Sequence, residues 1–288
     1  MGRIDQLYGD KRFTGSKLTE VQERVVDHLQ NDGVATVRFG ELFPDPRSWF
    51  ELAGDIAGFV ALTETRLPGM THEERVEEYG KVFLVRRFRV GRGGRGLERR
   101  VAGLDDLWLR LGASPEFLGI VNTYRGRMMR LNDLDNWYTV PEASEAERVA
   151  SQRWHRDGWE DHIVKVFTYF SDVDAEAGPF EYVTGSVSGG KYGSLWPWEE
   201  KEVYPPQDDF EARIGPEDRV TLTGPPGTIV FCDTSGFHRG GYARSRPRVL
   251  SYHTYISAEA EEGHKRLFDV DWSSGGADLP PESRYALE

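Results

Sequence analysis

The sequence predicts a mainly β protein with flanking helices, in which an antiparallel β core is covered by helices from the N-terminal part of the chain. Segments with helical periodicity and capping residues come first, up to about residue 125. From residue 127 onward, short β-branched and aromatic runs are separated by Gly and Pro turn signals. No linker-like stretch divides the two parts. We therefore expect a single domain over residues 1–288, with helices at about 18–125 packed on a β core at about 127–256.

Helices are predicted where apolar residues recur at a helical spacing behind a capping residue. In segment 19–30, Val21, Val25 and Leu29 share one stripe, and Asn31-Asp32-Gly33 ends it. The same signals predict helices from Asp45-Pro46 onward, at 73–79, and at 114–124 behind Ser114-Pro115, with a short strand at 34–39 after the first helix.

Strand signals dominate the remainder of the chain. Turn motifs such as Ala177-Gly178-Pro179 and Gly224-Pro225-Pro226-Gly227 separate the runs, as expected between antiparallel strands. The predicted strands are Lys81–Val90, Arg127–Tyr138, Ala150–His155, Ile163–Phe170, Phe180–Val183, Arg219–Leu222, Thr228–Cys232 and Arg248–Ile256.

Composition and net charge limit the classes of partner and the cellular compartment that we expect. The formal net charge is -12, which argues against nucleic acid as the main partner, because a phosphate backbone attracts basic surfaces. Cys232 is the single cysteine, so no internal disulfide can form, and we expect a reducing, cytoplasmic compartment. No apolar signal core or bilayer-length apolar run is evident, so we expect no membrane partner. The oligomeric state stays open.

An arginine-rich segment stands out in this acidic chain. Two interpretations remain open: a solvated edge strand and loop paired with carboxylates, or a lid that recognises an anionic group of the substrate. The residues are Arg86, Arg87, Arg89, Arg92, Arg95, Arg99 and Arg100.

The main functional motif of the sequence contains His155, at the end of the predicted strand 150–155, and Asp157, just after it. Side chains two apart on an extended segment point to the same face. A nitrogen and a carboxylate oxygen on one face supply two ligands of the 2-His-1-carboxylate triad that holds non-haem Fe(II). His238, far along the chain, can supply the third ligand, which would leave positions open for a bidentate cosubstrate and O2.

The flanks of His238 strengthen this hypothesis. The apolar run 226–231 leads to the site, and Arg246-Pro247-Arg248 precedes the last predicted strand. An arginine at that position can bind the far end of a dicarboxylate with a bidentate fork. Asp233 has two possible roles: it could orient His238 as a hydrogen-bond acceptor, or it could cap the turn.

Several motifs together resemble the phytanoyl-CoA dioxygenase family of Fe(II)/2-oxoglutarate oxygenases. The similarity extends from about Leu18 to Ile256 and is most specific between Ser151 and Arg248. It is carried by Trp154-His155-Arg156-Asp157, Val164-Lys165-Val166-Phe167, Asp172-Val173-Asp174, Gly178-Pro179-Phe180, Thr184-Gly185-Ser186, and the segment from Gly227-Thr228 to Arg248.

The resemblance implies a double-stranded β-helix (jelly-roll, cupin-like) fold, with Fe(II), 2-oxoglutarate and O2 as cofactors. It implies that His155, Asp157 and His238 are the catalytic metal ligands and that Arg248 binds the distal carboxylate of 2-oxoglutarate, with Arg246 and Arg244 as alternatives. It also places Lys165 and Phe167 on the neighbouring strand facing the site. Further candidates for hydrogen bonds to cosubstrate or substrate are Gln152, Asn132 and Asn136.

Members of the family often have Pro-Gly-Ser/Thr-His where this chain has Thr184-Gly185-Ser186-Val187, so substrate contacts are expected to differ. Because Asp157 is a carboxylate and not the small residue of related halogenases, the resemblance favours hydroxylation, desaturation or oxidative cyclisation. The stretch from Lys165 to Gly178 is similar to members that tailor natural products, including orthosomycin-type oxygenases of antibiotic biosynthesis.

The expected substrate is a small molecule, such as a saccharide-containing natural product. The alternatives are a non-catalytic jelly-roll module that binds carbohydrate and a metal cupin that does not use 2-oxoglutarate. Aromatic residues after the second glycine turn could stack on a sugar ring or could anchor their own loop. They are Tyr192, Trp196 and Trp198, and Pro197 lies between the two tryptophans.

Overall fold

The fold is described from a computed structural model, which covers residues 17–88, 100–142, 148–158, 160–196, 204–263, 265–273 and 275–288. The helices in these ranges are α2 (Glu20–Asp32), α3 (Phe39–Leu42), α4 (Pro46–Arg66), α5 (His72–Tyr79), α6 (Leu107–Gly112), α7 (Pro115–Arg125), α8 (Gln207–Arg213), α9 (Ala258–Gly263) and α10 (Pro281–Leu287). The strands are β1 (Val34–Arg38), β2 (Leu84–Arg86), β3 (Arg100–Gly103), β4 (Arg130–Thr139), β5 (Val164–Tyr169), β6 (Phe180–Val183), β7 (Arg219–Leu222), β8 (Thr228–Asp233), β9 (His238–Gly240), β10 (Arg248–Ile256) and β11 (Phe268–Asp271).

The predicted N-terminal helices begin at the capping residues that the sequence indicated. Thr19 and Gln22 make a reciprocal capping box at the start of α2, and Gly33 ends that helix with φ 79°, a left-handed conformation that suits glycine. Asp45 caps α4, and Ser114 caps α7.

The strands form three sheets. The first sheet has six strands in the order β1-β8-β5-β10-β4-β2, and its neighbours are antiparallel. The second has three antiparallel strands in the order β7-β6-β9. The third is the parallel pair β11-β3. Segments that are distant in sequence therefore lie side by side, and β10 pairs with both β4 and β5.

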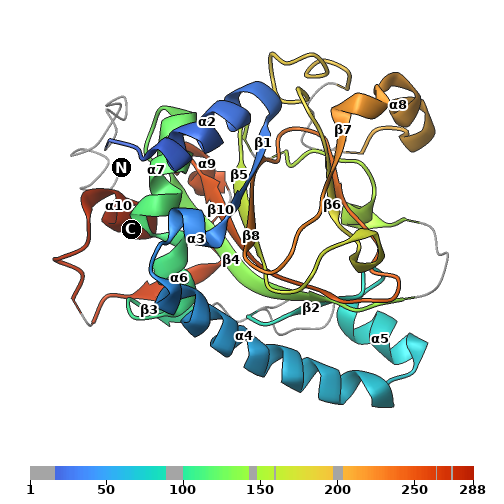
Figure 1. Cartoon of the computed structure of the whole chain (residues 1–288), viewed down its shortest axis with the longest axis horizontal. Coiled ribbons are helices and arrows are strands. Elements are labelled where there is room, and N and C mark those ends of the chain that lie inside the picture. Colours follow the sequence, from blue (N-terminus) through green and yellow to red (C-terminus); the bar gives the residue numbers. More distant parts are fainter. Residues whose placement is uncertain are drawn as a thin grey trace.

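Two layers cover the six-stranded sheet. Most helices lie on one side of it, and the three-stranded sheet lies on the other side (Figure 1). Side chains alternate between these layers along β5: Val164 and Val166 join the core under the helices, whereas Phe167 and Tyr169 pack with Phe180 of β6. The predicted antiparallel β core with helices outside it is confirmed.

Some predicted strands are wrong or shorter than expected. Residues 150–155 form no strand, because Ala150–Gln152 is a 3-10 turn in which the Gln152 side chain accepts a hydrogen bond from the Val149 backbone. Only Leu84–Arg86 of the predicted strand 81–90 is a strand in the described part, after Phe83 with φ 52°. Strands β3, β9 and β11 and helices α3, α6, α8, α9 and α10 were not predicted.

His253 of β10 lies on the helical side of the six-stranded sheet, where its Nε2 is 2.9 Å from the carbonyl oxygen of Trp108. Burial lowers the pKa of His253 to about 4. The unfolded chain, with an ordinary histidine pKa near 6.5, therefore binds the proton more readily than the folded chain. The contribution of neutral His253 to the free energy of unfolding is therefore fully present above about pH 6.5 and is lost as the pH falls toward 4.

We expect His253→Gln to flatten this acid-side decline in the metal-free protein. The buried imidazole contributes a slope of up to about 1.4 kcal/mol per pH unit between pH 6.5 and 4, and glutamine contributes none. Urea unfolding at several pH values measures the difference between the two proteins. If the free energies of unfolding of the wild type and of His253→Gln fell in parallel as the pH is lowered, His253 would not resist protonation.

No helix within the described ranges is long and apolar enough to cross a membrane.

Candidate metal centre

The backbone brings the two distant motifs into direct contact. His155 and His238 form an isolated antiparallel bridge with two N–H···O=C bonds of 3.0 Å. The Asp157 N–H donates to the Thr234 carbonyl at 2.8 Å, which continues the pairing. Although residues 150–155 are not a strand, His155 and Asp157 therefore project toward the same side, as the two-residue spacing predicted.

Arg156 projects to the opposite side and anchors this segment. Its buried guanidinium donates to the carbonyls of Ser186 at 2.8 Å, Ser235 at 2.7 Å and Gly193 at 2.9 Å. It also lies over the ring of Phe237, with 3.8 Å between Cζ and the centroid. Burial lowers the pKa of Arg156 to about 10. The residue between the two candidate ligands thus ties their segment to the loops on either side.

Arg156→Lys should destabilise the metal-free protein by about 2–4 kcal/mol, because a single ammonium cannot reach the same set of buried carbonyls. Arg153→Lys is the matched control, since the Arg153 guanidinium is only partly buried and makes a ring contact with Tyr204. Denaturant unfolding of both variants measures the effect. Equal free energies of unfolding for the two variants would contradict this role.

The side chains of His155, Asp157 and His238 converge. One donor atom from each lies within 4.8 Å of the others. The two imidazole centroids are 4.2 Å apart, and Nε2 of His238 is 3.9 Å from Oδ2 of Asp157. In the part of the chain that the structure describes, this is the one group of His, Cys, Asp or Glu side chains with such spacing.

Each imidazole is oriented by a backbone carbonyl. Nδ1 of His155 lies 2.8 Å from the carbonyl oxygen of Arg153, and Nδ1 of His238 lies 2.9 Å from that of Gly236. When Nδ1 carries the proton and donates to the carbonyl, Nε2 of each ring is free to bind a metal. Gly236 is required here, because a Cβ would lie 2.1 Å from the Tyr182 hydroxyl.

Electrostatics favours the metal-binding protonation states. Burial lowers the pKa of His238 to about 3, and burial also lowers the pKa of His155. Burial alone would raise the pKa of Asp157, but Lys165 and the two histidines outweigh it and lower that pKa. Near neutral pH the centre therefore presents two neutral nitrogens and one carboxylate, a donor set that suits Fe(II).

Lys165 and Phe167 lie on the same face of β5, and Lys165 reaches the centre. Lys165 Nζ is 2.6 Å from Asp157 Oδ2, and both side chains are largely buried. Phe167 packs on Phe180 with 5.1 Å between centroids, and Phe180 lies 5.5 Å from the His238 ring. Lys165 thus places a charged group beside Asp157, and Phe167 packs behind Phe180, which lies beside the His238 ring.

Arg248 is buried between the two sheets at the start of β10. Its guanidinium donates to the carbonyl of Gly178, while its Nε is buried with no hydrogen-bond partner in the described part. A Cβ on Gly240 would lie 3.7 Å from Nη2 of Arg248, so the guanidinium lies against the strand that carries His238. Arg246 instead lies at the surface and pairs with Asp174.

The remaining candidates lie elsewhere. The Gln152 side chain is buried and holds its own 3-10 turn. Asn132 sits at a β-bulge of β4, where its carbonyl accepts a hydrogen bond from the Leu267 backbone. Asn136 is buried beside Arg87 and Trp108 on the helical side, so no role in the centre follows from its position.

Asp233 caps the turn and does not orient His238. One oxygen accepts hydrogen bonds from the backbone and hydroxyl of Ser235, at 3.0 and 2.7 Å. The other accepts from Tyr124 at 2.7 Å and lies 2.5 Å from Nδ1 of His162. This buried cluster supports the loop between β8 and His238, and the sequence carries no signal that joins Tyr124 or His162 to it.

Helix α8 docks on the backbone just before His155. Gln207 accepts from the Trp154 N–H at 2.6 Å and donates to its carbonyl at 3.1 Å, and Glu211 accepts from the Trp154 indole at 2.8 Å. Tyr204, immediately before α8, places its ring 5.6 Å from that of His155. Sequence reasoning missed this half-exposed ring, because only tertiary contacts bring it to the centre.

Two predicted functional segments are only partly described. Arg87 pairs with Asp55, and Arg100 pairs with Asp106, which agrees with the carboxylate-paired interpretation at these two positions. Arg89, Arg92, Arg95 and Arg99 lie outside the described residues. Tyr192 is buried and donates to Asp218, so it anchors its own loop; Pro197 and Trp198 are outside the described residues.

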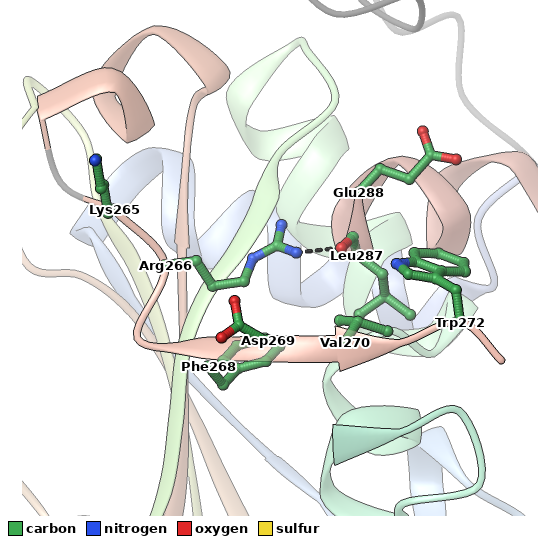
Figure 2. A pocket seen from close by; sticks show the side chains of 8 residues that line it. All are labelled: Lys265, Arg266, Phe268, Asp269, Val270, Trp272, Leu287 and Glu288. Atoms are coloured by element: carbon green, nitrogen blue, oxygen red, sulfur yellow. Dashed lines mark hydrogen bonds between the residues drawn. The ribbon is translucent and has the colours of Figure 1, made fainter. Parts of the chain in front are cut away.

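A separate cavity of about 340 Å³ lies between β11 and the end of α10 (Figure 2). It is lined by Lys265, Arg266, Phe268, Asp269, Val270, Trp272, Leu287 and Glu288. Arg266 donates to the carbonyls of Leu287 and, at 3.1 Å, Ala286, so its guanidinium caps the end of α10. Helix α10 packs on β4 and α7, so the cavity belongs to the helical side and not to the metal centre.

No protein-family model and no curated protein matches this sequence. Solved structures do match. A crystal structure of EctD from S. alaskensis with bound Fe is similar over 88% of this chain and 83% of that chain, with a TM-score of 0.50 and 15% sequence identity. This similarity shows the fold, and the expected double-stranded β-helix is confirmed.

Two further solved structures are similar at slightly lower scores. SnoN, described as a non-heme alpha ketoglutarate dependent epimerase from nogalamycin biosynthesis, matches over 83% of this chain and 84% of that chain, with a TM-score of 0.49 and 19% identity. AviO1 from Streptomyces viridochromogenes Tue57 matches over 84% of this chain and 97% of that chain, with a TM-score of 0.47 and 13% identity.

Proposed function

We propose that this protein is an Fe(II)- and 2-oxoglutarate-dependent oxygenase. The observation that carries the proposal is the convergence of His155, Asp157 and His238, with one donor atom from each within 4.8 Å of the others. Two imidazoles and one carboxylate are the facial set that binds non-haem iron and leaves positions open. When bound, iron supplies the activation of O2 with 2-oxoglutarate as electron donor, which yields succinate and CO2.

Arg248 supports the assignment of 2-oxoglutarate as cosubstrate. A buried guanidinium with an unpartnered Nε is costly unless an anion accompanies it. It faces the strand of His238 across Gly240, so a dicarboxylate can bind the metal at one end and Arg248 at the other. Phe167 and Leu250 lie in the apolar core between the two sheets, where they would shield the carbon chain of bound 2-oxoglutarate from water.

The chain itself positions the reactants and excludes water. The carbonyls of Arg153 and Gly236 hold the imidazoles in the required tautomer, and Arg156 fixes the segment between the ligands. The carboxylate of Asp157 favours hydroxylation or oxidative cyclisation over halogenation. Tyr204 lies beside His155 and is 36% exposed, so its ring is available to contact a bound substrate.

The proposed substrate is a small molecule, and the similarity of segment 165–178 to natural-product oxygenases favours a saccharide-containing metabolite. An exposed tyrosine ring at the rim suits packing against a sugar or another flat ring.

The purified protein supplied with Fe(II), 2-oxoglutarate and O2 should form succinate slowly even without substrate. A metal cupin that does not use 2-oxoglutarate would bind iron without forming succinate. A carbohydrate-binding module would bind sugar without metal and would tolerate His155→Ala. Either of these results would overturn the proposal.

A further inference from the structure

Arg153 lies on the same side of its segment as the candidate metal ligands. The backbone at Arg153 is extended, with φ -89° and ψ 152°, and His155 and Asp157 follow two and four positions later. Side chains two apart on an extended segment share a side. Trp154, between them, is fully buried on the opposite side, where its indole donates to Glu211 at 2.8 Å. The guanidinium of Arg153 is therefore directed to the side of the metal centre.

A contact with Tyr204 orients this guanidinium at the rim of the centre. Cζ of Arg153 lies 4.9 Å from the centroid of the Tyr204 ring, and that ring lies 5.6 Å from the ring of His155. A guanidinium held over an aromatic ring keeps its N–H groups available at its edge, where they can bind an oxyanion through two hydrogen bonds. Both side chains are partly exposed, so a ligand can approach them.

The guanidinium of Arg153 has no anionic partner in the part of the chain that the structure describes. Carboxylates are abundant in this protein of net charge -12, and other cations around the ligand segment are paired with them. Arg239 contacts Glu181 at 2.8 Å, and Lys165 contacts Asp157 at 2.6 Å. Arg153 forms no ion pair and no side-chain hydrogen bond with the described residues, and its contact is the ring of Tyr204. An oriented cation of this kind is suited to an oxyanion that arrives with a ligand.

We propose that Arg153, aligned by the ring of Tyr204, binds an oxyanion of the substrate, so that the protein oxidises an anionic small molecule. The carboxylate of an acidic sugar and the phosphate of a phosphorylated metabolite offer the same chemistry to a guanidinium. Arg248, buried between the two sheets, is left for 2-oxoglutarate. This inference rests on the proposed function for its reaction, but the binding of the anion is tested without turnover.

The test measures the binding of three probes to the anaerobic Mn(II) protein with saturating 2-oxoglutarate, which keeps the cosubstrate site filled. The probes are 4-nitrophenyl glucuronide, 4-nitrophenyl phosphate and the neutral 4-nitrophenyl glucoside. At least one of the two anions should bind roughly 10–100-fold more tightly than the glucoside, the range that a charge-assisted pair contributes. Tighter binding of the glucuronide indicates a carboxylate-bearing sugar, and tighter binding of the phosphate indicates a phosphorylated substrate.

Variants show whether the preference comes from this site. Arg153→Met should lower the affinity for the anions to that for the glucoside, whereas Arg153→Lys, which keeps the charge without the planar fork, should keep part of the preference. Tyr204→Ala should weaken anion binding, and Tyr204→Phe, which keeps the ring, should not. Arg24→Met, at an exposed ion pair with Glu41, is the control for loss of a surface charge and should bind all three probes as the wild type does.

Equal affinities of the wild type for the three probes, or binding of neither anion at millimolar concentration, would overturn the inference. A preference for anions that survives in Arg153→Met would also overturn it. If succinate forms with Fe(II) in any of these cases, the proposed function stands and the inference about the substrate fails. If the anions bind through Arg153 but no succinate forms with Fe(II) and 2-oxoglutarate, the binding site stands and the proposed oxygenase function fails. The two failures are thus distinguishable.

Discussion

His238→Ala is expected to abolish high-affinity metal binding and reduce 2-oxoglutarate-dependent succinate formation by at least roughly 100-fold. His238 contributes a nitrogen from β9, and without it only the neighbouring pair His155 and Asp157 remains on one segment. Loss of a protein ligand from a three-ligand site removes both affinity and the geometry that leaves positions open. Titration with Mn(II) and succinate detection measure the two effects.

His28→Ala is the matched control for this variant. His28 lies on α2 with its side chain 59% exposed and near Asp32, away from the candidate ligands. It should bind Mn(II) and form succinate as the wild type does. Succinate formation by His238→Ala at the rate of the control would contradict the assignment of the third ligand.

Arg248→Met is expected to raise the KM for 2-oxoglutarate roughly 10–100-fold, with a smaller effect on kcat at saturation. A charge-assisted contact to a buried carboxylate contributes about 1.5–3 kcal/mol, which corresponds to this range of affinity. Methionine fills a similar volume, and the metal-free protein should stay folded because the replaced guanidinium has an unpartnered Nε.

Arg246→Met distinguishes the two candidate arginines. Arg246 is two residues earlier but is exposed and paired with Asp174 at the surface. Its replacement should leave the KM for 2-oxoglutarate within about twofold, because rim charges contribute little. If Arg246→Met raises KM and Arg248→Met does not, the cosubstrate is held by Arg246 and the proposed orientation is wrong.

Local patterns predicted much of the architecture. Lys165 and Phe167 were placed on the strand that faces the site by the family resemblance. Capping residues marked the starts of α2, α4 and α7 within a few residues of the observed starts. These features depend on residues that are close in sequence, where periodicity and turn chemistry act directly.

Features that depend on tertiary contacts were missed. The bulge at Asn132 reverses the alternation of β4, so that Leu131 and Leu134 both join the core under the helices, and Asn136 points there as well. Helix α8 docks through the Gln207 amide on Trp154, a contact 53 positions apart in the chain. The strand predicted before His155 was wrong because a 3-10 turn satisfies its backbone locally.

The candidate ligands themselves could be found because their segment has a simple chemical pattern. A histidine and an aspartate two apart share a side even outside a regular strand, since the bridge to His238 keeps the backbone extended. Arg248 could be named from its position, but its burial and its unpartnered Nε are visible only in the folded chain.

Anomalous diffraction from crystals grown with Mn(II) and 2-oxoglutarate tests the central claim most directly. We expect one ion bound by Nε2 of His155, Nε2 of His238 and a single oxygen of Asp157, with the far carboxylate of 2-oxoglutarate on Arg248. An ion bound elsewhere on the chain, or a centre that stays empty at saturating Mn(II), would contradict the assignment of this protein as an iron oxygenase.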